Sequence, residues 1–193
     1  NKEIHTINPS TGTVIRSFIP MDSATTEHCL AQAVIGFHEW RNVPITDRAA
    51  CLRTLAEILR TDAERYAESI THEMGKPITD AKAEIEKCAK LCEWYATHGP
   101  AMLADEPADI PEAHTAYVSY LPLGTILGIM PWNFPFWQVM RAAVPIMIRG
   151  NGFLLKHASN VLGCAELLTE AWQRCGIPKG AFQWLHVPSA QIE

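Results

Sequence analysis

The sequence has no block of basic residues and no long apolar run. Its 193 residues include 16 lysines and arginines against 21 aspartates and glutamates, which gives a formal net charge of −5. Binding to a nucleic-acid backbone requires clustered positive charge, so we expect no nucleic-acid partner. No apolar stretch reaches the roughly 20 residues that cross a bilayer, so we expect no membrane-spanning segment.

Cysteine patterns typical of metal sites are also missing. There is no Cys-x-x-Cys, and the pair Cys88 and Cys92 has no histidine or carboxylate pair at a matching spacing, so no metal is expected. The six cysteines fall mostly among apolar residues of predicted helices, as structural thiols do in a reducing compartment. This distribution favours a cytoplasmic location.

The glycine fingerprint G-x-G-x-x-G is absent as well, because Gly124 and Gly128 do not form it. Its absence argues against an ordinary Rossmann dehydrogenase in this segment. The composition is otherwise that of an ordinary globular protein, with 48% hydrophobic and 19% charged residues, and the length allows a substantial core.

The first half of the chain is predicted to be a hairpin followed by helices. Turn residues and apolar spacing predict strands at 4–8 and 13–19, and helices from 22 or 23 to about 41, from about 47 to 74 and from about 79 to 98. Gly75 and Pro77 end the second of these helices. Residues 104–112 are rich in proline and acidic residues and are predicted to form a solvated connector.

The second half alternates between strands and helices. The predicted strands lie at 116–120, 125–130, 152–156 and 182–187, and the predicted helices at 136–148 and 162–175. The strand at 125–130 is expected to be buried. The alternation indicates a parallel sheet with right-handed crossovers. The predicted class is therefore α/β, a helical N-terminal region followed by the first part of a Rossmann-like sheet that is incomplete in this chain.

Asn133 stands between Pro131 and Pro135 in the sequence Pro-Trp-Asn-Phe-Pro, hereafter the PWNFP loop. Its amide offers two N–H donors and stays neutral, so it can stabilise an oxygen that becomes negative only during a reaction. The prolines restrict the backbone around it. The alternative is an asparagine that satisfies backbone groups of its own loop, which is a common role of this residue.

Lys156 ends an uncharged run at the predicted strand 152–156. A lysine at the end of a buried strand can donate to ribose hydroxyls or to a phosphate, or it can simply extend into solvent. Ser159 can cap a helix predicted to begin near Asn160. A helix start beside a strand end is also where nucleotide phosphates bind.

Arg141 lies eight residues after Asn133 on the predicted helix 136–148, a little over two turns away, and can therefore point to the side of the loop. A guanidinium there could bind a carboxylate through two hydrogen bonds. The alternative is an arginine exposed to solvent.

Together these segments resemble the aldehyde dehydrogenase superfamily over essentially the whole chain, and the PWNFP loop with its downstream lysine is the most specific part. The other matching segments are 8–12, 73–77, 121–124, 150–151, 154–156 and 176–180. Residues 137–141 and the sequence Lys156-His157-Ala158 are most similar to bacterial NAD(P)-dependent succinate-semialdehyde dehydrogenases. His157 stands where most relatives have a proline, a difference expected to change the rigidity of the loop more than its chemistry.

The resemblance implies a mechanism and a set of site residues. A cysteine thiolate attacks a small aldehyde that bears a carboxylate, an amide like Asn133 holds the oxyanion, hydride passes to NADP or NAD, and water activated by a glutamate releases the acid. The implied cofactor contacts are Ile129, Met130, Pro131, Trp132, Asn133, Lys156, His157, Ala158 and Ser159. The implied substrate contacts are Phe134, Trp137 and Arg141. Many NAD-preferring relatives have a glutamate at the position of Ser159, so the serine favours acceptance of NADP.

The resemblance also implies an organisation of the chain. Residues 1–112 match the helical part of the cofactor-binding domain, 113–123 an extended segment of an oligomerisation sheet, and 124–193 the start of the NAD(P)-binding domain. The superfamily's glycine-rich turn, catalytic glutamate and nucleophilic cysteine would follow Glu193, so we expect an N-terminal portion of a longer enzyme that forms a homodimer or homotetramer. Two alternatives stay open, a truncated relative that binds a nucleotide without turnover and a member acting on another aldehyde or an acyl phosphate.

Overall fold

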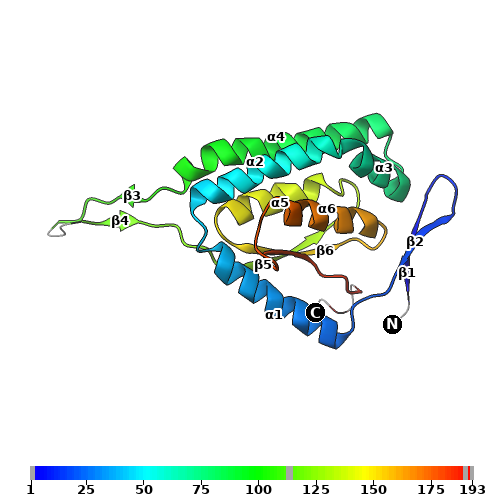
Figure 1. The fold of residues 1–193 in the computed structure, drawn as a ribbon, viewed down its shortest axis with the longest axis horizontal. Helices are drawn as coiled ribbons and strands as arrows, with labels where there is room; N and C mark the ends of the chain where they lie inside the picture. Colours follow the sequence, from blue (N-terminus) through cyan, green and yellow to red (C-terminus); the bar gives the residue numbers. More distant parts are fainter. Residues whose placement is uncertain (1–2, 112–114, 189–190, 192–193) are drawn as a thin grey trace.

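A computed structural model of the chain describes residues 3–111, 115–188 and 191 and has the predicted α/β class (Figure 1). The elements are β1 Ile4–Ile7, β2 Val14–Phe18, α1 Ser23–Trp40, α2 Ile45–Thr61, α3 Ala63–Met74, α4 Ile78–Met102, β3 Glu106–Pro107, β4 Tyr117–Val118, β5 Thr125–Met130, α5 Trp137–Ile148, β6 Gly152–His157, α6 Leu162–Arg174 and β7 Phe182–Trp184. The end of the predicted connector at 112 and the start of the predicted segment 113–123 lie outside the described residues.

The central sheet is parallel, with the strand order β5-β6-β7. The middle strand β6 is buried along its whole length. In the register between β5 and β6, Thr125 pairs with Gly152 and Met130 with His157, so the two strands end side by side. The loops that follow them, the PWNFP loop and residues 158–161, therefore leave the sheet at the same edge.

Helices cover the two faces of the sheet unequally (Figure 1). Helix α1 packs on one face, and α5 and α6 pack on the other, where α2, α3 and α4 form a further layer outside them. The contact of α1 with the chain before β7 is so close that a Cβ at Gly36 would lie 2.3 Å from the backbone nitrogen of Ala181. Gly180 has a φ of +90°, and a Cβ there would lie 2.2 Å from the carbonyl oxygen of Gln32. Neither position can hold a side chain without movement of α1.

Two expectations about the elements are wrong. The helix predicted from 47 to 74 is two helices, which separate at Asp62, where the backbone leaves the helical conformation. The Asp62 carboxylate pairs with Arg174 of α6 at this break. Strand β5, predicted to be buried, is an edge strand with Leu127 and Ile129 exposed to 43% and 59%. Leu127 and Ile129 lie on the same face of β5 as Thr125, whose hydroxyl donates a hydrogen bond to α1. Helix α1 covers β5 only near Thr125, so Leu127 and Ile129 stay exposed.

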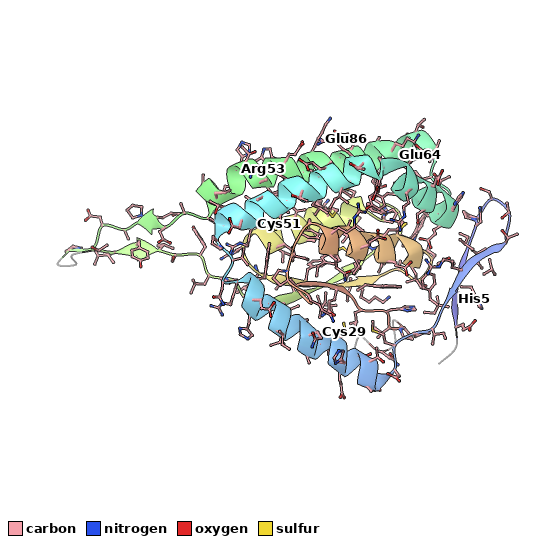
Figure 2. The ribbon with its side chains drawn as sticks, viewed as in Figure 1. His5, Cys29, Cys51, Arg53, Glu64 and Glu86 are labelled. Atoms are coloured by element: carbon pink, nitrogen blue, oxygen red, sulfur yellow. The ribbon has the colours of Figure 1, made fainter. Side chains whose placement is uncertain are left out.

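The cysteines are structural thiols, as predicted. Five of the six are buried, Cys51 is half-buried, and all are free of disulfides. Cys29 on α1 and Cys51 on α2 lie on opposite sides of the sheet (Figure 2). Burial is the largest cause that raises the pKa of every one of these thiols, and it raises that of Cys175 to about 12. In the described residues no group of three His, Cys, Asp or Glu side chains could hold a metal ion.

Strands β3 and β4 form an antiparallel pair that extends away from the rest of the molecule (Figure 1). The predicted strand 116–120 is shorter than expected and covers only Tyr117–Val118. The residues that lead from β4 back to the sheet remain accessible, with Leu123 exposed to 85%. Across the part of the chain that the structure describes, every helix is too short or too polar to cross a membrane.

Candidate functional site

The PWNFP loop connects β5 to α5 at the carboxyl end of the sheet. Its first residues are exposed, whereas Pro135 and Phe136 are buried, so the loop is anchored at its C-terminal end. The chain after β6 lies beside its start, because the backbone N–H of Ala158 donates to the carbonyl oxygen of Met130 at 3.1 Å. The structure thus brings together the two segments that were predicted to form the site.

Glu84 of α4 holds the end of this loop. Its Oε1 accepts hydrogen bonds from the backbone N–H groups of Phe136 and Trp137, each at 2.9 Å. These are unpaired donors at the start of α5, where a carboxylate is favoured by both hydrogen bonding and the helix dipole. The other oxygen pairs with Lys76, whose Nζ also lies 3.7 Å from the centre of the Phe134 ring. A buried ion pair of the helical layer therefore fixes the loop.

His157 holds the same loop from the side of the sheet. Its ring is 2% exposed, and its Nε2 lies 2.8 Å from the carbonyl oxygen of Pro135. Its Nδ1 accepts a hydrogen bond from the backbone N–H of Ala158 at 2.9 Å and lies 3.3 Å from the carbonyl oxygen of Met130. Burial lowers the pKa of His157, and the Lys156 cation lowers it further, so the ring is neutral at pH 7.

The Asn133 side chain is exposed and makes no hydrogen bond to the residues that the structure describes. The alternative in which this amide satisfies its own loop therefore has no contact to support it. Both N–H donors of Asn133 remain available on a loop whose following residues are anchored. A neutral donor held in this way can stabilise a developing oxyanion.

A cavity of about 340 Å³ lies next to the carboxyl end of β6. Its lining includes Lys156, His157 and Ser159, together with Trp184 and His186 from β7 and the chain after it. Lys156 is only 7% exposed, and burial lowers the pKa of its ammonium group. Ser159 is exposed and carries a hydroxyl where a carboxylate would repel a phosphate. The cavity offers a cation and a hydroxyl to a ligand that has both hydroxyls and negative charge.

Ser159 does not cap the following helix. Helix α6 begins at Leu162, the start of the predicted range 162–175, and its first N–H groups are occupied by Glu73 of α3. The Glu73 carboxylate accepts from the N–H of Gly163 at 2.8 Å and of Cys164 at 2.9 Å. A protein carboxylate thus occupies the place where a phosphate could have bound, and the Ser159 hydroxyl takes no part in the cap.

The remaining predicted site residues occupy the same edge of the sheet. Ile129 and Pro131 are exposed, and Met130 and Ala158 are half-buried. Trp132 lines a second cavity of about 420 Å³, together with residues of the N-terminal hairpin.

Arg141 is exposed on α5, and in the described residues it has no ion-pair partner. It lies four residues after Trp137, so the two share one face of the helix. Trp137 is half-buried, and the Nζ of Lys87 lies 3.9 Å from its ring centre. The assignment of substrate contacts to these side chains stays a prediction.

Sequence reasoning missed Glu73 and Glu84. A signal was present, because each lies on the apolar stripe of its helix, Glu73 three residues after Ile70 and Glu84 three residues after Ala81. A carboxylate on a buried face needs a hydrogen-bonding partner. The partner itself, the N-terminus of another helix, could not be identified from spacing within one helix.

Known proteins resemble this chain closely. The chain is 52% identical over 181 residues to the Escherichia coli (strain K12) protein named succinate semialdehyde dehydrogenase NAD(P)+ Sad. It is 43% identical over 193 residues to the Mycobacterium avium (strain 104) protein named succinate-semialdehyde dehydrogenase NADP(+). These matches take in 93% and 98% of this chain but only 39% and 41% of the relatives, so the chain spans about two fifths of their length.

The fold has close counterparts among solved structures. The crystal structure of succinic semialdehyde dehydrogenase from Streptococcus pyogenes in complex with NADP+ matches with a TM-score of 0.92 and 33% identity, over 98% of this chain and 42% of that one. The sequence model of the aldehyde dehydrogenase family matches residues 1–193 of this chain. This chain therefore belongs to the aldehyde dehydrogenase family.

Proposed function

We propose that the full-length protein that carries this chain oxidises succinate semialdehyde, or a similar small aldehyde with a carboxylate, to the acid. The observation that carries the proposal is the exposed amide of Asn133, which has no hydrogen bond to the described residues, on the loop that follows β5, while the neighbouring strand β6 ends with the buried cation of Lys156. The amide suits an oxyanion, and the cation suits a nucleotide. The names of the two bacterial relatives support the substrate class.

The role of Asn133 follows from the charge that develops in the reaction. Attack of a thiolate on an aldehyde carbon transfers negative charge to the carbonyl oxygen. The Asn133 N–H groups would bind that oxygen more strongly than the neutral carbonyl, which lowers the barrier. Burial raises the pKa of all six cysteines of this chain. We place the thiolate in the part of the relatives' length that the chain does not span.

We propose NADP or NAD as the cofactor, with NADP accepted at least as well as NAD. When bound, this group accepts the hydride. Lys156 would donate to the ribose hydroxyls or the 2′-phosphate, and Ser159 adds a hydroxyl without a negative charge. Ser159→Glu should shift the preference toward NAD by roughly 1–3 kcal/mol, through loss of a hydrogen bond and repulsion of the phosphate. The ratio of kcat/KM for the two cofactors measures this shift, and a hundredfold preference of the wild type for NAD would contradict the assignment.

We also propose that the protein acts in a reducing compartment such as the cytoplasm, as a dimer or tetramer. The free, buried thiols support the compartment. The extended pair of β3 and β4, followed by accessible apolar residues, supports assembly with other copies.

The proposed activity is tested with the full-length protein, succinate semialdehyde and NADP, by following the formation of NADPH. Asn133→Ala should lower kcat about 10²–10³-fold, because one oxyanion donor is lost. A loss below about tenfold in a folded variant would contradict the role of Asn133. A panel of neutral aldehydes distinguishes another substrate class, and nucleotide binding without turnover on any aldehyde would favour a binding protein.

A further inference from the structure

The ring of His157 connects two segments that carry different parts of the proposed site. His157 is the last residue of β6, directly after Lys156, whereas its Nε2 contacts the carbonyl oxygen of Pro135 in the PWNFP loop at 2.8 Å. The two residues are 22 apart in the chain. The contact therefore joins the strand end that faces the cavity to the loop that carries Asn133.

The partners of the ring define where its proton lies. Nδ1 lies 2.9 Å from the backbone nitrogen of Ala158, which is a donor, and 3.3 Å from the carbonyl oxygen of Met130, which is an acceptor, so the shorter contact favours an Nδ1 without a proton. The carbonyl oxygen of Pro135 can only accept, so Nε2 must carry the proton and donate it. His157 is thus a neutral imidazole in one tautomer, with each nitrogen in a backbone hydrogen bond.

The Pro135 contact matters because Asn133 has no anchor of its own. Pro135 has no N–H, so its carbonyl oxygen is its only backbone hydrogen-bonding group. Glu84 holds the next two N–H groups, those of Phe136 and Trp137. The chain just after Asn133 is therefore fixed by Glu84 through its donors and by His157 through its acceptor.

We propose that His157 is a positioning residue, whose hydrogen bond to the Pro135 carbonyl sets the place of the Asn133 amide relative to the cofactor cavity. This inference rests on the proposed function. The bond acts on the chemical step because it reaches the loop that carries Asn133, whereas the part of His157 that lines the cavity is separate from this hydrogen bond. Displacement of a catalytic group by about 1 Å can cost 10²-fold in rate, so loss of this bond should lower kcat.

The test compares three substitutions in the full-length protein. His157→Gln keeps an amide N–H near the position of Nε2, so it can still donate to Pro135. His157→Asn is too short to reach Pro135 but can still accept from Ala158. His157→Phe fills the space and makes neither bond. Leu168→Ala, in the buried core of α6, is the control for a loss of stability that leaves the loop untouched.

We expect kcat, per folded protein, to fall about 10- to 100-fold in His157→Asn and His157→Phe. His157→Gln should keep most of the wild-type kcat, and in His157→Asn and His157→Phe the loss of kcat should exceed any loss of affinity for NADP. Leu168→Ala should lower the melting temperature without changing kcat per folded protein.

Three results would overturn the inference while the wild type is active on succinate semialdehyde. The first is an equal kcat in His157→Gln and His157→Phe. The second is a kcat loss below about threefold in both His157→Asn and His157→Phe. The third is a parallel loss of NADP affinity and kcat. If His157→Phe does not fold, the comparison of the Gln and Asn variants still decides. An inactive wild type on every aldehyde of the panel would instead refute the proposed function, and this inference with it.

Discussion

At the scale of single residues, two buried carboxylates join the helical layer to the sheet. Glu84 accepts from the start of α5 and Glu73 from the start of α6, so each occupies a helix end that would otherwise expose unpaired N–H groups. The surroundings of Glu73 leave no room for a larger neighbour, since a Cβ at Gly163 would lie 2.7 Å from its Oε1. These two contacts determine how both helices sit at the edge that carries the site.

Glu84→Ala should lower the free energy of unfolding by about 3–5 kcal/mol, because the substitution leaves a nearly buried Lys76 without its partner and two N–H groups of α5 without an acceptor. Urea denaturation followed by tryptophan fluorescence measures the loss.

The control for this experiment is an exposed ion pair. Glu93 pairs with Arg60 on the outer surface of α4 and α2, with both side chains partly exposed. Glu93→Ala should cost less than about 1 kcal/mol, since solvent screens the pair. Equal losses in the Glu84 and Glu93 variants would show that burial of the carboxylate contributes nothing.

The neutral, buried ring of His157 gives stability a dependence on pH. Burial and the Lys156 cation lower its pKa below 6.5, and the carbonyls of Pro135 and Met130 raise it by less. Between the folded and unfolded pKa values the unfolded chain binds more protons, so stability is lost as the pH falls below about 6.5. From about pH 7.5 to about pH 5, the melting temperature should fall less in His157→Gln than in the wild type.

The control for the change of side chain is His157→Phe, which also lacks the titrating ring and should show the same reduced slope of melting temperature against pH. A melting temperature that falls more steeply with falling pH in His157→Gln than in the wild type would mean that folding raises the pKa of His157. This result would contradict a neutral ring.

At the scale of elements, local signals predicted most of the fold. Strand β5 was placed at its observed bounds, and the strand-helix alternation after it gave the parallel sheet. The errors arose where a long-range contact decides. The break between α2 and α3 falls where Asp62 meets Arg174, and the exposure of Leu127 depends on how far α1 reaches along β5. Arg174 lies far from Asp62 in the sequence, and α1 lies far from β5, so the periodicity of a single segment could not reveal either contact.

The same distinction applies to the site. Asn133 and Lys156 were proposed from their positions after and at the end of predicted strands. The residues that fix their loop, Glu84 and His157, act through backbone groups of distant segments, and a sequence pattern does not show which backbone groups lack partners.

Helix α5 carries the prediction on substrate charge. Arg141 shares a face with Trp137 and is free of ion pairs in the described part of the chain, so its guanidinium is available to a carboxylate. Arg141→Leu should raise KM for succinate semialdehyde, by an amount equivalent to about 1.5–3 kcal/mol, the usual contribution of hydrogen bonds to a charged group. Steady-state kinetics on succinate semialdehyde and butanal test it, because butanal lacks the carboxylate and should be spared. Equal losses on both aldehydes would make Arg141 structural.

At the scale of the whole molecule, the extended pair of β3 and β4 leaves the compact part of the protein (Figure 1). Tyr117 and Val118 on β4 are exposed, as are Leu121 and Leu123 after it. Apolar side chains on a projecting pair of strands favour contact with another copy of the chain.

Val118→Glu should therefore shift the full-length protein toward smaller assemblies. A charge placed on a packed apolar interface costs several kcal/mol, enough to dissociate a moderately stable oligomer. Size-exclusion chromatography with light scattering measures the mass. Lys90→Glu, an exposed charge reversal on α4, should leave the mass unchanged. An unchanged mass in Val118→Glu would place the interface elsewhere.

The tight contact between α1 and the chain before β7 has a consequence for synthesis. The side chain of Gln183 donates to the carbonyl oxygen of Cys29 at 2.8 Å, across a separation of 154 residues. At about 5–20 residues per second, the ribosome needs roughly 8–30 s to produce the second partner after the first. Until β5 and β6 have been made, α1 has no sheet to pack on, although α2, α3 and α4 can already associate, and its contacts with β7 form last. Helix α1 therefore completes its packing later than the helices that follow it in the chain, and its apolar face stays accessible to a chaperone until then.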